Sequence, residues 1–321
     1  MKARILIGLA AAACLAMAAL FAGCSKPNQG RVAKPSGAKR YTIGFAMTLT
    51  DPYWQNMRLG ALDEGKKDNA DVIILNAEED VQKQGQQVND LIARRVDIVC
   101  LVPMKPDALV NSVRALNEAR IPVIIVNREI GPGCDCVAYT GTDTYQGGVV
   151  SAEILMKAIG GRGKIVEFQQ VLGTGPQLAR TKALQDVMRK YPGVDLVAQI
   201  PHEGDNAKVV SEMGALLSKY PDLKGVYVHG DPQALAAGNA CTNAGRRDIK
   251  IVGMGGSEQA IEAIKEGRLT GTSYQKPEEE GRSGIRLAVE YLKNGSLPKK
   301  RYPIRCEPIV KENASQFKGQ F

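Results

Sequence analysis

The chain has 321 residues, of which 44% are hydrophobic, so it is long enough to bury one large core or two ordinary ones. Its net charge of +8 is spread along the chain and forms no groove rich in arginine and aromatic residues, which argues against nucleic-acid binding. It has only two histidines, His202 and His229, and Cys134 and Cys136 stand in a single CxC loop. We therefore expect no metal site, because such a site needs more ligands.

The first residues have the layout of a secretory signal. Lys2 and Arg4 precede an apolar stretch, 5–20, that is short and alanine-rich for a permanent transmembrane helix. The stretch runs into Phe21-Ala22-Gly23-Cys24, which resembles the bacterial lipobox, with Phe21 where leucine is usual. The resemblance implies a signal peptide at 1–23 and lipid attachment at Cys24; an ordinary secretory signal with an incidental cysteine is the alternative. Either way we expect an extracytoplasmic protein, and the lipidated form would be held on a membrane whose identity stays open.

Residues 24–39 contain Pro, Gly, Ser and Lys without apolar periodicity, which predicts a flexible tether before a fold that begins near Arg40. Five cysteines follow Cys24, and an odd number cannot all pair with one another. Cys100 lies in an apolar run, so we expect it to be a buried free thiol. The pairing of the whole set stays open: Cys100, Cys134, Cys136, Cys241 and Cys306.

From Arg40 onward, short apolar runs alternate with amphipathic stretches, a pattern typical of βα units on parallel sheets. The first series predicts strands at 41–47, 72–76, 98–102, 123–127 and 137–140, with helices at 53–69, 81–94 and 108–119. The second predicts helices at 145–159, 177–190, 207–219, 232–243 and 259–266, with strands at 164–169, 194–199, 225–229, 250–252 and 269–275. A helix at 280–293 and a last strand around 302–307 complete the chain. Two such series in tandem predict an α/β protein with two doubly wound lobes.

Ligands on open parallel sheets bind beyond the carboxyl ends of the strands, so residues directly after strands are the candidate site. Asp51 is a good helix cap and Pro52 suits a first helical turn, which places Tyr53 and Trp54 at this edge. Two adjacent rings at a helix start point in different directions, so we expect one of them to face something other than the core. Further residues directly after strands are Asn127, Arg128, Asp231 and Gln275.

Catalytic and cofactor motifs are weak in this chain. The stretch 160–164 precedes a strand and has no Ser or Thr after its lysine, so it is a turn and no phosphate loop. The stretch 253–257 lacks the third glycine of a dinucleotide fingerprint, and we interpret it as a turn that lines the site. No Gly-x-Ser-x-Gly elbow occurs. We therefore expect no enzyme activity and no cofactor.

The order of these motifs resembles that of the type I periplasmic solute-binding proteins, in particular the ribose/galactose-type sugar receptors of ABC importers. The resemblance runs from about Tyr41 to Glu307 and is carried by IGFAMTLTDPYW, QGQQVNDLIARRVDIVCLVP, IPVIIVNRE, YTGTDTYQGG, GTGPQLARTKAL, GVYVHGDPQALAAG, IVGMGGS and GTSYQKPEEEG. It implies two Rossmann-like lobes joined by three chain crossings, with the N-terminal lobe (lobe one) at 40–142 plus 276–304. The C-terminal lobe (lobe two) would then comprise 143–275 plus 305–321.

The same resemblance implies roles for individual residues. Asp51 would accept from hydroxyls, while Tyr53 and Trp54 would pack on a sugar ring, because a sugar has an apolar C–H face. Asn127 and Arg128 match a pair that grips hydroxyls in the family. Two further positions match ligand residues, Arg180 and Gln275. The alternatives are rings that merely close the strand end, a surface salt bridge for the lobe-two arginine, and a hinge hydrogen bond for the amide.

The chain also departs from the ribose-type pattern. Gly230 and Gly255 stand where an asparagine and an aspartate are expected, and the expected lobe-two aromatic aligns near Gly204. We infer a ligand other than plain ribose, bulkier on that side or partly anionic. Substitute contacts could come from His202, Glu203, His229, Asp231 and Ser257.

The resemblance implies a monomeric, lipid-anchored receptor that binds a sugar-like solute between two closing lobes and delivers it to the membrane subunits of an ABC permease. One alternative is a lipoprotein that presents its ligand to a sensor kinase or chemoreceptor, and another is an enzyme that uses the same cleft. Lactose-repressor-type regulators share the fold, but they carry a helix-turn-helix where this chain has a secretion signal, so DNA binding is excluded. Which solute binds stays open.

Overall fold

A computed structural model describes residues 40–48, 51–319 and 321. The predicted signal peptide (1–23), the tether (24–39) and Cys24 lie outside the described residues, and these assignments stay predictions. Residues Arg40–Phe321 belong to one compact unit. Within the described ranges, no helix has both the length and the apolar character that crossing a membrane requires.

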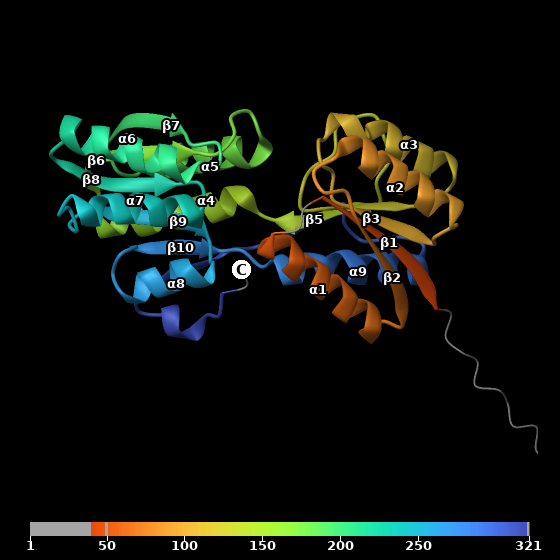
Figure 1. The fold of residues 1–321 in the computed structure, drawn as a ribbon. Helices are drawn as coiled ribbons and strands as arrows, with labels where there is room; N and C mark the ends of the chain where they lie inside the picture. Colours follow the sequence, from red (N-terminus) through yellow and green to blue (C-terminus); the bar gives the residue numbers. More distant parts are fainter. Residues whose placement is uncertain (1–39, 49–50, 320) are drawn as a thin grey trace, which may run out of the picture. The chain divides into compact units, whose positions relative to one another are not determined.

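Two six-stranded sheets organise this unit (Figure 1). The sheet of lobe one has the order β11-β5-β4-β3-β1-β2, and all neighbouring strands in it are parallel. The sheet of lobe two has the order β12-β10-β9-β8-β6-β7 and is parallel except for the pair β10 and β12. The strands are β1 (Tyr41–Met47), β2 (Ala70–Asn76), β3 (Ile98–Leu101), β4 (Val123–Val126), β5 (Ala138–Thr142), β6 (Arg162–Gln169), β7 (Gly193–Pro201), β8 (Leu223–Val228), β9 (Lys250–Gly255), β10 (Gly271–Tyr274), β11 (Arg301–Ile304) and β12 (Glu307–Val310).

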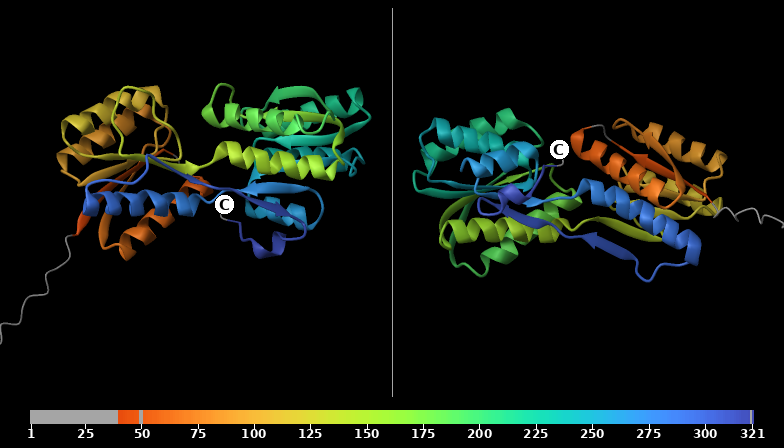
Figure 2. Two further views of the ribbon diagram at one scale, coloured as in Figure 1. Left: turned by 180° about the vertical axis from the view of Figure 1, so that it is seen from behind. Right: turned by 90° about the horizontal axis from the view of Figure 1, so that it is seen from below.

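Helices cover both faces of each sheet, as Figure 2 shows. In lobe one, α1 (Pro52–Lys67) and α9 (Pro277–Asn294) pack on one face, and α2 (Val81–Ala93) and α3 (Val110–Glu118) pack on the other. In lobe two, α4 (Thr144–Ala158) and α5 (Gly175–Met188) pack opposite α6 (Asn206–Lys219), α7 (Asp231–Asn243) and α8 (Glu258–Lys265). Two short 3₁₀ helices are η1 (Asp107–Leu109) and η2 (Ala314–Gln316). The predicted class, two doubly wound α/β lobes, is confirmed.

The chain passes between the two sheets three times, after β5, after β10 and after β11. The last passage corrects the sequence prediction of a single strand around 302–307. β11 pairs with β5 in lobe one, whereas β12 pairs with β10 in lobe two, and only Arg305 and Cys306 separate them. An extended run gives no sign in its own sequence that it changes partner sheet half-way, which explains the error.

Two of these passages are tied together by side-chain and backbone hydrogen bonds. Gln146, in the first turn of α4, donates from Nε2 to the carbonyl of Cys306 at 3.1 Å and accepts from the backbone N–H of Cys306 at 2.8 Å. The backbone N–H of Asp143 donates to the carbonyl of Ile304 at 2.9 Å. The second passage contacts the third through an ion pair of two partly exposed side chains, Lys276 and Glu307.

All five described cysteines are free thiols. Cys100 is fully buried and its Sγ donates to the carbonyl of Gly284 at 3.3 Å, which confirms the expected buried thiol. Burial raises the pKa of the Cys100 thiol, so it stays protonated and unreactive at neutral pH.

Helices α1 and α9 approach so closely that both need glycine at the contact. A Cβ on Gly60 would lie 2.0 Å from the carbonyl oxygen of Glu278, and a Cβ on Gly281 would lie 2.0 Å from that of Met57. The start of α1 is fixed as the sequence predicts, because the Asp51 side chain accepts from the backbone N–H of Tyr53 at 2.9 Å. The close contact brings the first turns of the two helices together at the edge where the site is expected.

We expect Gly60→Ala to lower the free energy of unfolding by about 3 kcal/mol, because the added methyl meets backbone that cannot rotate away. The matched control is Gly214→Ala in α6, where a Cβ meets nothing within 4 Å. This control should raise stability by about 0.5–1 kcal/mol, since alanine favours helix. Urea unfolding of both variants measures the difference, and equal stabilities would contradict the proposed role of the helix contact.

Candidate ligand-binding site

A buried carboxylate organises the lobe-one side of the site. Glu280, in the first turn of α9, has no exposed surface. Its Oε2 accepts from the Tyr53 hydroxyl at 3.0 Å and from Asn127 Nδ2 at 2.7 Å, and its Oε1 accepts from the backbone N–H of Thr142 at 2.7 Å and from the Thr142 hydroxyl. Burial raises the pKa of Glu280, and these donors oppose that rise. The cluster joins α1, the ends of β4 and β5, and α9 at one point.

Asn127 follows β4 with a backbone φ of 61°, in the left-handed region that asparagine tolerates better than most residues. Its carbonyl accepts from the Tyr139 hydroxyl at 2.8 Å, and its amide also donates to the Tyr53 hydroxyl at 3.2 Å. The turn holds the amide side chain beside Tyr53 and points the next residue, Arg128, toward Trp54.

The two adjacent rings have different surroundings, as the sequence predicted. Trp54 is only 6% exposed and packs in the lobe-one core, while Tyr53 is partly exposed. Their centroids are 5.4 Å apart with planes at 66°. The guanidinium of Arg128 lies 5.0 Å from the centroid of the Trp54 ring, and its Nη1 donates to the carbonyl of Met104 at 3.3 Å. Burial lowers the pKa of Arg128, although not enough to neutralise a guanidinium.

In lobe two, Arg180 lies on α5 and is only 8% exposed. Its Nη1 donates to the carbonyl of His229 at 2.9 Å. Burial lowers the pKa of Arg180, and the side chains of Tyr227 and Cys306 oppose that fall. In the described part of the chain, neither Arg180 nor Arg128 has a carboxylate partner within 4.0 Å.

A second buried carboxylate, Glu167 near the end of β6, is linked to Arg180 through His229. It accepts from His229 Nε2 at 2.8 Å, Thr181 Oγ1 at 2.7 Å and Gln199 Nε2 at 2.6 Å. Burial raises its pKa, but these hydrogen bonds outweigh burial and hold the pKa below the ordinary value. The other ring nitrogen of His229, Nδ1, is buried and has no hydrogen-bond partner among the described residues.

Asp231 and Gln275 lie around the turn that follows β9. Asp231 is fully buried, and its carboxylate accepts from the backbone N–H groups of Gly256 at 2.6 Å and Ser257 at 2.8 Å and from the Thr272 hydroxyl at 2.6 Å. Burial raises its pKa. The backbone N–H of Gln275 donates to the carbonyl of Gly255 at 2.8 Å.

Residues 43–296 match the family described as periplasmic binding protein domain. The chain belongs to this family. It is a type I periplasmic binding protein of the ribose type, as the sequence motifs indicated. Members of this group are sugar-binding proteins of ABC transporters, so substrate binding in an extracytoplasmic location is the role that the family implies.

Among similar proteins, the ribose import binding protein of Salmonella typhimurium is 29% identical over 265 residues, covering 83% of this chain and 88% of that protein. A xylitol-binding protein of Mycolicibacterium smegmatis is 29% identical over 293 residues, covering 91% of this chain and 82% of that protein. A solute-binding protein of Bacillus halodurans with bound myo-inositol has a TM-score of 0.78 and 25% identity, covering 88% of this chain and 98% of that one.

The structure of this binding protein brings several predicted residues together. Tyr53, Asn127 and Arg128 lie around one edge of lobe one, with Asp51 exposed at the start of α1. Arg180 lies buried on α5 in lobe two and donates to the carbonyl of His229, so its role toward a ligand beside Tyr53 stays a prediction. The bonding capacity of Asp231 is largely used within its own lobe, and its role toward a ligand stays a prediction, as does that of Gln275.

Sequence reasoning missed the two carboxylates that hold these groups, Glu280 and Glu167. Glu280 is the third of three consecutive glutamates at the start of α9, and the run itself does not reveal which one is buried. Glu167 lies between Val166 and Phe168 in the buried second half of β6, where an acidic residue could have signalled a buried partner.

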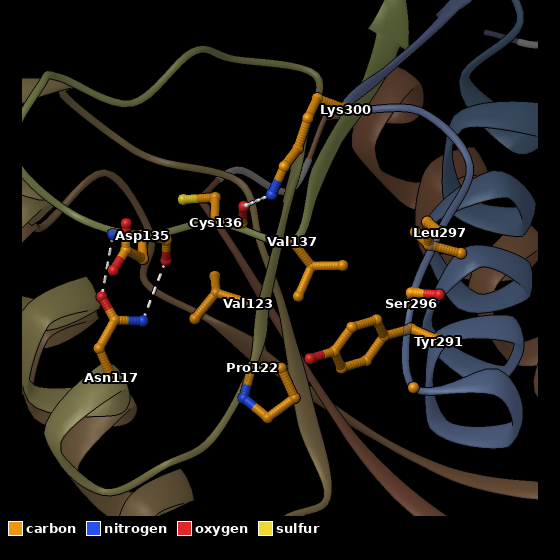
Figure 3. A pocket seen from close by; sticks show the side chains of 11 residues that line it. Asn117, Pro122, Val123, Asp135, Cys136, Val137, Tyr291, Ser296, Leu297 and Lys300 are labelled. Carbon is orange, nitrogen blue, oxygen red and sulfur yellow. Dashed lines mark hydrogen bonds between the residues drawn. The ribbon is translucent and has the colours of Figure 1, made fainter.

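A separate hollow of about 470 Å³ lies at the amino end of β4 (Figure 3). Pro122, Val123 and Tyr291 line it, Asn117 hydrogen-bonds the backbone of Asp135, and Lys300 Nζ donates to the carbonyl of Cys136 at 3.2 Å. Since this family fold binds ligands at the carboxyl ends of its strands, we assign this hollow no part in solute binding.

His202 should make the stability of the binding protein depend on pH. Its Nδ1 accepts from the backbone N–H of Gly204 at 2.9 Å, and burial, together with the charges of His229, Arg180 and Lys208, lowers its pKa from 6.5 to about 4. Between pH 4 and pH 6.5 the His202 imidazole therefore binds a proton in the unfolded chain but not in the folded chain. The stabilisation is present above pH 6.5 and is lost as the pH falls toward 4, by roughly 2–3 kcal/mol.

The variant His202→Asn tests this, because an asparagine oxygen can still accept from Gly204. The free energy of unfolding in urea, measured at pH 7 and at pH 4.5, should fall less in the variant than in the wild type. An identical fall in both proteins would show that His202 does not titrate in this way.

Proposed function

We propose that this chain binds a sugar or sugar-like solute with Tyr53, Asn127 and Arg128 from lobe one and Arg180 and Gln275 from lobe two, and that it delivers the solute to the permease of an ABC importer. Asp51, Trp54 and Asp231 belong to the same proposed site. No chemical step is involved. The solute is recognised by hydrogen bonds and ring contacts alone.

The observation that carries this proposal is the pair of desolvated arginines. Arg180 is buried and Arg128 is half-buried, and burial lowers the pKa of each, yet neither has a carboxylate partner in the described ranges. Desolvating a guanidinium without such a partner is unfavourable unless something else accepts its hydrogen bonds. The planar fork of donors fits two vicinal hydroxyls or a carboxylate, which are the groups a sugar or sugar acid presents.

The aromatic residues supply the complementary apolar contact. The Tyr53 ring is partly exposed while its hydroxyl is held by Glu280, so the ring cannot turn away from the edge of the sheet. A sugar or cyclitol has an apolar C–H face that packs against such a ring at small entropic cost. Polar donors on one side and a fixed ring on the other together favour a polyhydroxylated solute.

The names of the relatives support the same solute class. The three proteins named above take their names or bound ligands from ribose, xylitol and myo-inositol, and all three compounds are neutral and polyhydroxylated. Gly230 and Gly255 supply no side-chain hydrogen bond, and the space beside them is filled by Gln233 and by Asp231 and Phe321. We therefore propose a solute other than plain ribose, one that carries an acidic group toward an arginine.

We propose further that the chain is a monomeric lipoprotein. Lipid on Cys24 and the tether 24–39 would keep it near the permease, and the lobes would close when the solute contacts both of them. Contacts from both lobes stabilise only the closed form, so the ligand shifts the population toward it. The permease would then recognise the closed form.

We expect Arg180→Met to weaken solute binding about 100-fold, since it removes charge-assisted hydrogen bonds worth about 3 kcal/mol in a desolvated position. The matched control is Arg189→Met at the end of the same helix, where the arginine is exposed and pairs with Asp186 at 2.7 Å. Calorimetric titration with D-ribose, D-allose, xylitol, myo-inositol and D-galacturonate measures both. Unchanged affinity in Arg180→Met would remove this arginine from the site.

Lipid anchoring is tested separately by Cys24→Ser. The variant should appear in the soluble fraction of cells that retain the wild-type protein on membranes, because the lipid supplies the attachment. Uptake of the bound sugar by those cells should fall as well. Loss of anchoring with unchanged uptake, in cells that need the protein for a response to the sugar, would favour a sensing role over transport.

A further inference from the structure

The last residue of the sequence, Phe321, lies at the proposed site. Its ring centroid is 5.3 Å from that of Tyr53, with the planes at 68°. The end of the chain, marked C, lies beside the start of α1 in Figures 1 and 2. Phe321 as a whole residue is partly exposed. Tyr53 therefore has one aromatic neighbour from its own helix, Trp54, and one from the far end of the sequence.

On its other side the Phe321 ring lies against the turn after β9. A Cβ on Gly255 would come within 3.2 Å of the ring atom Cζ, and Gly255 has a φ of 152°, a conformation that favours glycine. The carbonyl of Phe321 accepts from the backbone N–H of Glu258 at 2.8 Å, at the start of α8. The missing side chain at position 255 thus leaves the space that the ring occupies.

The segment that leads to Phe321 is fixed to lobe two. Ala314 is fully buried, and the Phe317 ring packs on Tyr274 with centroids 5.2 Å apart. The Tyr274 hydroxyl donates to the carbonyl of Lys318 at 3.1 Å. A Cβ on Gly319 would lie 2.4 Å from the backbone of Glu258, so the chain runs in direct contact with the helix start. These contacts fix the segment that precedes Phe321 on lobe two.

We propose that Phe321 is a ligand-contacting and specificity-determining residue, the aromatic side chain that lobe two contributes beside Tyr53. This inference rests on the proposed function and names a further residue of the same site. Phe321 offers a flat apolar surface and no hydrogen bond, so it favours a solute with a C–H face on that side. It disfavours a solute that would have to bury a charged group against the ring.

The test compares Phe321→Ala with Phe317→Ala by calorimetric titration against D-ribose, D-allose, xylitol and myo-inositol. For the neutral compound that binds wild type most tightly, Phe321→Ala should weaken binding about 10-fold, which corresponds to losing one ring contact of about 1.4 kcal/mol. Phe321→Tyr should restore most of it. Phe317→Ala, which removes a ring from the lobe-two core, should lower the melting temperature with a smaller change in affinity.

The outcomes separate the two proposals. If wild type binds none of these compounds or D-galacturonate, the proposed function fails and this inference fails with it. If wild type binds and Phe321→Ala binds equally tightly, only the inference is overturned. Tighter binding by Phe321→Ala also overturns it, because the ring would then be a plug that the solute displaces. Should Phe321→Ala not fold, Phe321→Leu, which keeps apolar volume without a planar ring, takes its place with the same expected loss.

Discussion

The carboxylate of Glu280 is the group on which the lobe-one side of the site depends. It receives hydrogen bonds from residues of three different elements, Tyr53, Asn127 and Thr142, that are distant from one another in the sequence. A buried carboxylate is stable only when donors satisfy it, so each of these residues is held in one orientation. The ring of Tyr53 and the amide of Asn127 are therefore set in place before a solute arrives, which reduces the entropy lost on binding.

In lobe two, a different buried acid orients its neighbours in the same way. Glu167 is buried in β6 and collects donors from Thr181, Gln199 and His229, while the carbonyl of His229 accepts from Arg180. The arginine is thus positioned through a chain of hydrogen bonds and not by an ion pair. A direct carboxylate partner would have consumed the donors that we propose for the solute. In each lobe, a buried acid holds residues that we propose to contact the solute.

Much of the architecture follows from the sequence. The alternation of apolar runs and amphipathic stretches predicts two doubly wound lobes, because helices that cover both faces of a parallel sheet impose that pattern. The strands at the end of the chain were harder to predict, because β11 and β12 are four-residue strands of different sheets with two residues between them. The pattern of Tyr53 and Trp54 indicated one ring for the core and one for the edge, and the burial of Trp54 agrees.

The site was predictable only where residues follow strands directly. Glu280 sits within a run of acids, and Phe321 lies 268 positions beyond Tyr53, the residue whose ring it contacts (321 − 53). Neither spacing nor periodicity therefore connects either residue to its contacts. Tertiary contacts determine the neighbours of both residues. For Glu280, the glycines that allow α1 and α9 to approach closely are the main ones. Patterns within a short stretch of sequence do not reveal such tertiary contacts.

The hydrogen bonds of Gln146 have a mechanical consequence. The Gln146 side chain pairs with both backbone groups of Cys306, and the backbone N–H of Asp143 donates to the carbonyl of Ile304. The first and third connections between the lobes are therefore joined directly by hydrogen bonds. The remaining passage, at Lys276, is joined to the third by the pairing of β10 with β12, in which Tyr274 lies opposite Glu307, and by the ion pair of Lys276 with Glu307, which is worth little in water. All three connections are therefore joined to one another, and the proposed closure would have to bend them together instead of one at a time.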